Sequence, residues 1–143
     1  MMAFLLDTNV VSETIRARPE RSVLDWLEAQ TPRDLYLAAQ TLGELVRGAR
    51  KTGDRIRRQR LERWIEVDLT KQFEGRVLPF DGAAASIWGR LMGDGQRSGR
   101  TPASADAQIA AVAIRHEITV ATRNTKDFEH LDVKLFNPWH TRQ

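Results

Sequence analysis

Short apolar runs alternate with stretches of helical periodicity along the chain. The apolar runs predict buried strands, and apolar residues recurring every three or four positions between them predict amphipathic helices. We predict strands over residues 3–6, 35–37, 76–80, 118–122 and 133–136. We predict helices over residues 9–15, from Ser22 to near Thr31, from near Thr41, around Leu61–Ile65, after Asp81 and over 105–116.

Several polar residues stand where predicted helices begin. Ser22, with Asp25 three residues later, resembles a capping box, and Asp81 and Ser104 are expected to cap two further helices. The glycine-rich segment 93–102 is the most loop-like part of the sequence.

Strands that alternate with helices require crossover connections, and these produce a parallel sheet with helices on both faces. We therefore expect an α/β fold, namely a three-layer α/β/α sandwich with a mainly parallel central sheet. The 143 residues contain no repeat and no linker, so we expect a single domain over residues 1–143.

The composition is that of a globular protein, with 41% hydrophobic and 29% charged residues. The absence of cysteine excludes a disulfide framework, a thiolate zinc site and a cysteine nucleophile, and it fits a reducing cytoplasm. No apolar run approaches the ~20 residues of a membrane helix. The apolar start of the chain stops at Asp7 and follows no basic segment, unlike a signal peptide. We therefore expect a cytoplasmic protein with no membrane partner.

The basic residues are concentrated in one part of the chain. The whole chain has a net charge of +3, but residues 47–63 contain eight basic and two acidic residues, so the remainder is acidic. Such a stretch is either a solvated helix face or a surface for a polyanion or an acidic protein segment.

Polar residues from four separate segments fall where the predicted topology brings them together. Asp7 ends the first strand, Asn124 and Asp127 follow the strand over 118–122, and Glu44 and Asp106 fall in the first turns of two helices. In open α/β sheets, sites form outside the carboxyl ends of the strands. We therefore expect these side chains to meet at one cleft.

Each of the acidic residues also has a purely structural explanation. Asp7 could cap a helix, Glu44 could be a surface residue, Asp106 could favour a helix start, and Asp127 could lie in a solvated turn. Asp106 fits this explanation least, because it stands among small and apolar residues with no Lys or Arg nearby in sequence. A buried carboxylate is strongly disfavoured unless it is paired or binds a metal.

Clustered carboxylates repel one another, and a divalent cation relieves that repulsion. Oxygen ligands favour Mg²⁺ or Mn²⁺, whereas zinc is disfavoured because Cys is absent and the three His residues show no ligand spacing. A cation held in this way suits hydrolysis of a phosphodiester by direct attack of water.

Motifs of other phosphate chemistries are missing from the sequence. No GxxxxGK[ST] loop is present, and no GxGxxG follows a predicted strand, so a P-loop NTPase and dinucleotide binding are not supported. In Asp7-Thr8-Asn9, Asn stands where phosphatases with an aspartyl nucleophile usually have a second Asp, so this class of phosphatase is disfavoured.

Four short segments stand in an order and spacing that identify a family. They are Leu5–Ser12 (LLDTNVVS), Thr41–Gly48 (TLGELVRG), Asp106–Ala111 (DAQIAA) and Thr122–Phe128 (TRNTKDF). They resemble the four acidic motifs of PIN-domain ribonucleases and, among these, of the VapC toxins of type II toxin–antitoxin systems. Leu78–Asp81 (LPFD) and Phe136–Trp139 (FNPW) are similar to the FitB-like branch of that family.

The resemblance implies a PIN-like α/β/α sandwich that uses Mg²⁺ or Mn²⁺ to cleave RNA. It implies a toxin that targets tRNA or rRNA, stops translation and forms a homodimer. It also implies a VapB-like antitoxin that covers the active site, with promoter DNA bound only through the toxin–antitoxin complex. By the same resemblance, Asp7, Glu44 and Asp106 would hold the metal.

The fourth position of the site stays open at this stage. Either Asp127 supplies a carboxylate, or Asn124 contacts the metal or its water through an amide. The first motif adds Thr8 and Asn9 as residues expected at the substrate. Arg123, beside the predicted cleft, is a candidate for binding phosphate, although it could equally be a surface arginine in a turn.

Two other functions are compatible with these residues. One is a catalytically silent PIN-fold binding module that acts with a DNA-binding antitoxin partner, which the intact acidic residues disfavour. The other is a metal-dependent DNA nuclease, which we rank lower because the short chain lacks room for elements that clamp a duplex.

Overall fold

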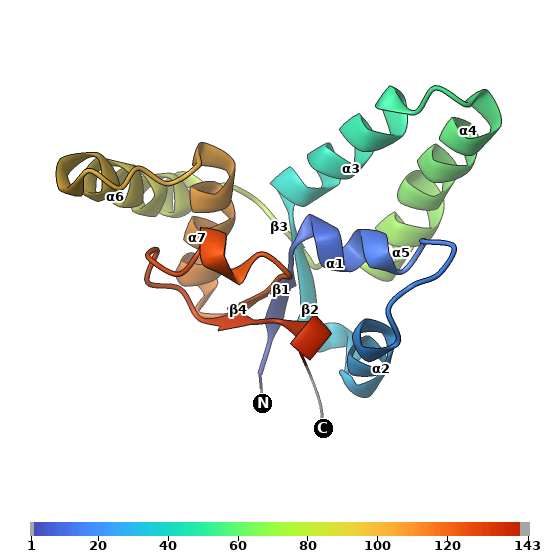
Figure 1. Cartoon of the computed structure of the whole chain (residues 1–143), viewed down its shortest axis with the longest axis horizontal. Helices are drawn as coiled ribbons and strands as arrows, with labels where there is room; N and C mark the ends of the chain where they lie inside the picture. Colours follow the sequence, from blue (N-terminus) through green and yellow to red (C-terminus); the bar gives the residue numbers. More distant parts are fainter. Residues whose placement is uncertain (1, 141–143) are drawn as a thin grey trace.

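Five parallel strands form the central sheet of residues 2–140, the part of the chain that this computed structural model describes. Their order across the sheet is β3-β2-β1-β4-β5, and each neighbouring pair is parallel (Figure 1). This confirms the predicted α/β class. The strands are β1 (Phe4–Leu6), β2 (Leu35–Ala38), β3 (Val77–Leu78), β4 (Thr119–Ala121) and β5 (Leu135–Phe136).

The helices connect these strands as crossovers, as the alternation of patterns predicts. Helices α1 to α5 lie between β1 and β3 in sequence, and α6 and α7 lie between β3 and β4. The main helices are α1 (Thr8–Glu13), α2 (Arg21–Ala29), α3 (Ala39–Lys51), α4 (Arg55–Arg63), the π-helix η2 (Trp64–Leu69), α5 (Thr70–Gln72), α6 (Gly82–Ser98) and α7 (Ser104–His116). Short 3₁₀ turns complete the described chain: η1 (Pro32–Asp34), η3 (Thr125–Asp127) and η4 (Pro138–His140).

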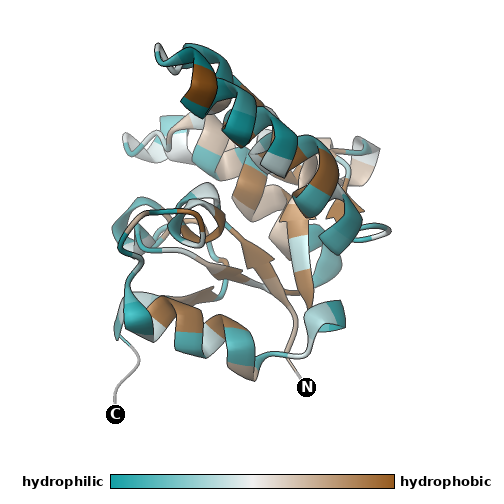
Figure 2. Ribbon diagram, turned by 90° about the vertical axis from the view of Figure 1, so that its right-hand side faces the viewer, coloured by the Kyte–Doolittle hydropathy of each residue, from teal (hydrophilic) through white to brown (hydrophobic). Residues whose placement is uncertain are grey.

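The sheet separates two hydrophobic cores because successive strand side chains point to opposite faces. Phe4 and Leu6 of β1 pack into the core with α1, α2, α3 and η2, whereas Leu5 packs on the other face against α7. The strands are accordingly mostly hydrophobic along their length (Figure 2). Because β1 lies between β2 and β4, its end at Asp7 falls at the centre of the carboxyl edge.

The loop predicted over residues 93–102 is wrong in its first part, because residues 93–98 are helical. Helix α6 continues through Gly93 and Gly95 to Ser98, and the chain turns only at Gly99, which has a left-handed conformation with φ 79°. A Cβ at Gly95 would lie 2.6 Å from Cδ of Pro102 and 2.8 Å from the Arg100 carbonyl oxygen. Gly95 is therefore required by close packing inside a helix, and sequence periodicity does not reveal that requirement.

Two of the three predicted caps are also wrong. Asp81 caps α6 as predicted, accepting a hydrogen bond of 2.9 Å from the Ala84 amide. In contrast, α2 begins at Arg21, so Ser22 lies inside the helix, and its hydroxyl has no hydrogen-bond partner among residues 2–140. Ser104 is the first residue of α7 rather than its cap. Over residues 2–140, the longest helices are too short or too polar to cross a membrane.

Candidate active site

Asp7 is fixed at the point where β1 becomes α1. Its amide donates to the Ala121 carbonyl at 2.9 Å, which continues the pairing of β1 with β4 past the end of the strand. Its carboxylate caps α1, with Oδ1 accepting a hydrogen bond of 2.9 Å from the Thr8 amide. The capping role and a position at the sheet edge are therefore both real, and they do not exclude one another.

Thr122 ties Asp7 to the loop that follows β4. Its hydroxyl donates to Oδ2 of Asp7 at 2.8 Å. The Thr122 hydroxyl oxygen in turn accepts hydrogen bonds from Nδ2 of Asn9 at 3.3 Å and from the Asn124 amide at 3.0 Å. Thr122 is fully buried, and sequence reasoning missed its role. The available signal was a hydroxyl at the last position of a predicted strand, beside Arg123-Asn124.

Glu44 reaches the same edge from α3. It is the sixth residue of that helix and so lies in the second turn, one turn later than predicted. Its Oε1 accepts a hydrogen bond of 3.0 Å from the hydroxyl of Thr8. Thr8 therefore connects the acidic residue of α3 to the start of α1.

Asp106 lies in the first turn of α7, as predicted, and is half-buried. Burial, and to a smaller extent the negative charges of Asp127, Asp7 and Glu44, together raise the pKa of its carboxyl to about 6. The four carboxylates thus lie within electrostatic range of one another although they come from four separate segments. No salt bridge to Asp106 is formed within residues 2–140.

The pKa of Asp7 is also raised, mainly by burial. Hydrogen bonds from Thr122 and Thr8 act against this rise, whereas the charges of Glu44 and Asp127 add to it. Two of the four carboxylates are therefore held where the ionised form is disfavoured. A nearby cation would reverse this balance.

The residues after β4 differ in how they face the cluster. Asp127, in η3, acts electrostatically on both Asp7 and Asp106. Asn124 contacts the group through its backbone amide, which donates to Thr122. Of the two candidates for the fourth position, Asp127 therefore acts on the cluster through its charge, and Asn124 contacts it through the backbone.

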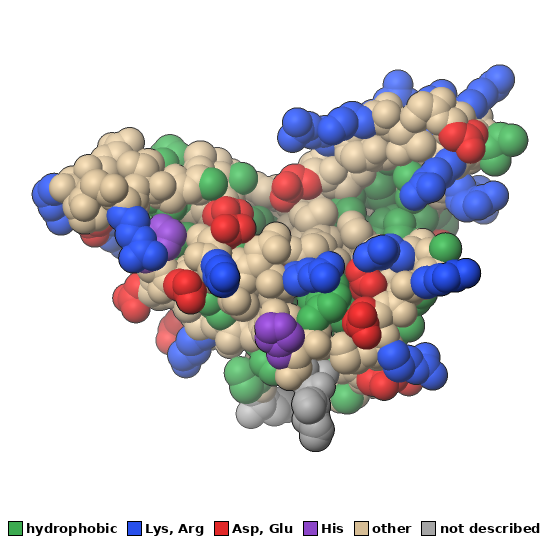
Figure 3. All heavy atoms as spheres, viewed as in Figure 1, with side chains coloured by type: hydrophobic (Ala, Val, Ile, Leu, Met, Phe, Trp, Pro, Cys, Tyr) green, Lys and Arg blue, Asp and Glu red, His purple; other side chains and the backbone are tan. Residues whose placement is uncertain are grey.

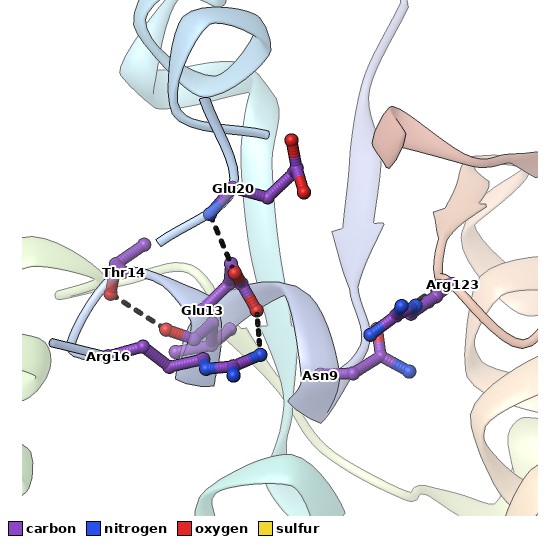
Figure 4. Close-up of polar contacts among 7 residues, drawn as sticks. Asn9, Glu13, Thr14, Arg16, Glu20 and Arg123 are labelled. Carbon is purple, nitrogen blue, oxygen red and sulfur yellow. Dashed lines mark hydrogen bonds and ion pairs between the residues drawn. The ribbon is translucent and has the colours of Figure 1, made fainter. Parts of the chain in front are cut away.

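Asn9 and Arg123 lie side by side next to this cluster (Figure 4). The Arg123 amide donates to Oδ1 of Asn9 at 3.2 Å, and the Arg123 guanidinium lies 5.2 Å from the centre of the Trp139 ring. Arg123 and Trp139 also line an open pocket of about 570 Å³ together with Lys126, Asp127 and His140. Trp139 is partly buried and packs against the hydrophobic core that contains Phe4 and Leu6.

In space, the molecule is hollowed between the arm formed by α3 and α4 and the arm formed by α6 and α7 (Figures 1 and 3). Acidic side chains appear at the floor of this hollow, and Lys and Arg side chains cover the α3–α4 arm (Figure 3).

The oxygen donors of the cluster fit a hard divalent cation by their chemistry. They are carboxylates with lone pairs left over after the hydrogen bonds described above, and two of them are destabilised as anions. Among residues 2–140, however, no three acidic or histidine side chains converge closely enough to form a ready-made metal group. The donor set fits, while the side chains do not meet at one point.

A parallel α/β sandwich with acidic residues at the carboxyl edge of its sheet defines a class of proteins that includes metal-dependent nucleases. The family model "PIN domain" matches residues 4–134. This chain belongs to the PIN domain family.

Several proteins of that family are similar to the chain over nearly its whole length. It is 40% identical over 136 residues to Toxin FitB of Neisseria gonorrhoeae, covering 95% of this chain and 98% of FitB. It is 41% identical over 135 residues to VapC ribonuclease Y4jK of Sinorhizobium fredii, covering 94% and 96%. It is 32% identical over 141 residues to the tRNA(fMet)-specific endonuclease VapC of Shigella flexneri, covering 97% and 99%.

Solved structures agree with the fold. The crystal structure of FitAcB from Neisseria gonorrhoeae matches with a TM-score of 0.92 and 40% identity, covering 96% of this chain and 99% of that one. The structure of FitAB bound to an IR36 DNA fragment matches with a TM-score of 0.91 and 38% identity, covering 98% of each chain. The predicted resemblance and the PIN-like sandwich are thereby confirmed.

Proposed function

We propose that this protein is a Mg²⁺- or Mn²⁺-dependent endoribonuclease that acts as the toxin of a toxin–antitoxin pair. The observation that carries this proposal is the placement of Asp7, Glu44 and Asp106 near one edge of the sheet, where Thr8 contacts both Asp7 and Glu44 and the half-buried Asp106 has no ion pair within residues 2–140. When carboxylates without a cationic partner lie together at one sheet edge, a bound cation stabilises their ionised forms.

In this proposal Asp7, Glu44 and Asp106 hold the ion, and Asp127 is the fourth acidic group. When bound, the ion would supply an activated water and stabilise charge on the scissile phosphate and the leaving oxygen. Thr122 and Thr8 orient the Asp7 carboxylate, and Thr8 also orients Glu44. Asn124 secures the loop that carries Asp127 through its bond to Thr122.

RNA is the proposed substrate because the relatives named above include a ribonuclease and a tRNA-specific endonuclease. Asn9 accepts a hydrogen bond from the Arg123 amide and so fixes the backbone of Arg123. The Arg123 side chain therefore extends toward a phosphate from a fixed backbone position. We infer cleavage of tRNA or rRNA in the cytoplasm, with loss of translation as the cellular result.

A VapB-like antitoxin is the proposed partner of a homodimeric toxin. The similarity to a FitAB structure bound to DNA supports a complex that binds promoter DNA, with the antitoxin making the DNA contacts. The alternative function, a silent PIN module that works only through such a complex, is also compatible with this similarity.

The two functions are separated by incubating purified protein, freed of any antitoxin, with tRNA and rRNA. The proposal predicts cleavage with Mg²⁺ or Mn²⁺, no cleavage with a chelator, and no cleavage by Asp7→Asn. Sequencing the 5′ ends of the RNA fragments would then identify the phosphodiester bond that is cleaved. Translation arrest that persists in Asp7→Asn, without any cleavage, would support the silent module instead.

A further inference from the structure

A strongly basic pocket lies beside the acidic cluster. It has a volume of about 820 Å³ and is formed by the end of α1, the connection from α1 to α2, and helices α3 and α4. Among the described residues, its lining has no acidic side chain and includes four arginines, Arg16, Arg18, Arg57 and Arg60.

Three of these arginines have no acidic partner within residues 2–140. Arg16 forms an ion pair with Glu13 at 3.3 Å, whereas Arg18, Arg57 and Arg60 form none. All four side chains belong to exposed residues. Uncompensated guanidinium groups that converge on one concavity favour an anionic ligand, and their fork of donors suits phosphate oxygens.

The pocket begins one helical turn away from the acidic cluster on two helices at once. Thr8 and Glu44 are hydrogen-bonded to one another at the cluster. Ser12 and Gly48, four residues further along α1 and α3, line the pocket. Four residues of α-helix advance about 6 Å along the axis. A chain held in the pocket would therefore pass directly to the acidic edge.

The two segments that carry the arginines are held in place. Glu13 is buried, and its carboxylate accepts a hydrogen bond of 2.7 Å from the Glu20 amide in addition to the bond from Arg16 (Figure 4). This fastens the connection that bears Arg16 and Arg18. On the other side, the ion pair Arg50–Glu62 at 3.0 Å joins α3 to α4, which bears Arg57 and Arg60.

We propose that Arg16, Arg18, Arg57 and Arg60 form a binding site for the phosphate backbone of single-stranded RNA, adjacent to the scissile bond. This rests on the proposed nuclease function. An acidic cluster repels a polyanion, so a site of opposite charge next to it is needed to hold the strand. Phosphate contacts of this kind position a strand without reading its sequence.

The test measures binding separately from cleavage. A short fluorescent single-stranded RNA is titrated with protein in a chelator, so that no metal-dependent cleavage occurs. Arg57→Gln/Arg60→Gln is compared with Arg55→Gln/Arg63→Gln, which removes the same charge from the same helix outside the pocket lining. Thermal melting establishes that both variants are folded.

We expect the pocket variant to weaken RNA binding by about tenfold and to reduce the slope of log affinity against log salt by about 1.4, since each phosphate contact on a single strand contributes about 0.7. The matched variant, Arg55→Gln/Arg63→Gln, should lose much less RNA affinity. Equal losses in the two variants, or no loss in the pocket variant, would overturn the site. So would unchanged RNA affinity together with lost capture of a co-expressed partner protein, since the pocket would then bind the partner.

The two proposals fail differently. If wild-type protein binds RNA through the pocket but cleaves nothing with Mg²⁺ or Mn²⁺, the nuclease function fails and the phosphate site stands. If wild-type protein cleaves RNA and the pocket variant binds and cleaves equally well, the site fails and the nuclease function stands.

Discussion

The hydroxyl of Thr122 donates a hydrogen bond of 2.8 Å to the carboxylate of Asp7, a residue 115 positions earlier in the chain. This contact joins the ends of two neighbouring strands, β1 and β4, at the edge where the acidic residues gather. It also lowers the pKa of Asp7 against the stronger effect of burial.

Thr122→Val should destabilise the protein at neutral pH. The substitution keeps the shape but removes the donor to Asp7 and the acceptor for Asn9 and the Asn124 amide. Hydrogen bonds to charged groups contribute about 1.5–3 kcal/mol, so we expect a loss of about 2 kcal/mol in the free energy of unfolding, measured by denaturant titration. Thr119→Val is the matched control, because Thr119 is buried in β4, the strand that Thr122 directly follows, and its hydroxyl makes no hydrogen bond within residues 2–140. Equal losses would show that Thr122 acts only through packing.

Asp106→Asn should stabilise the metal-free protein at neutral pH while abolishing RNA cleavage. The substitution removes a half-buried charge that Asp127, Asp7 and Glu44 repel. After allowance for solvent screening we expect a gain of about 1 kcal/mol, visible as a higher melting temperature in a chelator. A variant that is less stable and fully active would contradict both the repulsion and the role in catalysis.

The stability of the metal-free protein should fall as the pH rises through about 6 relative to Asp106→Asn. Folding raises the pKa of Asp106 from 3.8 to about 6, so the folded state favours the protonated form. The stabilisation is therefore fully present below the unfolded pKa and is lost as pH rises through the folded pKa. Melting temperatures of both proteins across this range measure the difference. Parallel curves would mean that Asp106 titrates normally.

Metal affinity should change with pH in the opposite direction. Divalent ions bind the ionised carboxylates, so a raised pKa makes protons compete with the ion. We expect Mg²⁺ affinity, measured by calorimetry, to weaken steadily below about pH 6, the pKa given for Asp106. Affinity that is constant through this range would exclude Asp106 as a ligand.

Asp127→Asn should reduce cleavage far more than Asn124→Ala. The Asp127 charge acts on both Asp7 and Asp106, whereas Asn124 contributes its backbone amide, which alanine retains. We expect at least about a hundredfold loss of kcat for the first variant, the scale on which positioned acid–base and charge effects act, and a small change for the second. The reverse ranking would assign the fourth position to Asn124.

The sequence alone predicted the parallel sheet and the shared location of the acidic residues. Both follow from the alternation of elements and from the rule that strand ends meet at one edge. Asp7 and Asp106 lie where their positions relative to a strand end and a helix start indicated.

What the sequence did not predict depends on contacts between distant segments. The long helix α6 depends on the approach of residues 100–102 to Gly95, and the role of Thr122 depends on the pairing of β1 with β4. The sequence shows the basic stretch of residues 47–63 but not which of its arginines share a pocket. Arg57 and Arg60 share one with Arg16 and Arg18, which belong to a distant segment of the chain. Hydrophobic periodicity predicts local secondary structure, but it does not predict contacts between segments that are far apart in the sequence.

The most direct test of the central claim is a titration of Mn²⁺ into the purified protein, followed by electron paramagnetic resonance. If Asp7, Glu44 and Asp106 gather around a hard divalent ion, wild-type protein should bind Mn²⁺ and Asp7→Asn and Asp106→Asn should lose that binding while remaining folded. Binding of Mn²⁺ that is equal in all three proteins, or absent from the wild type, would contradict the account.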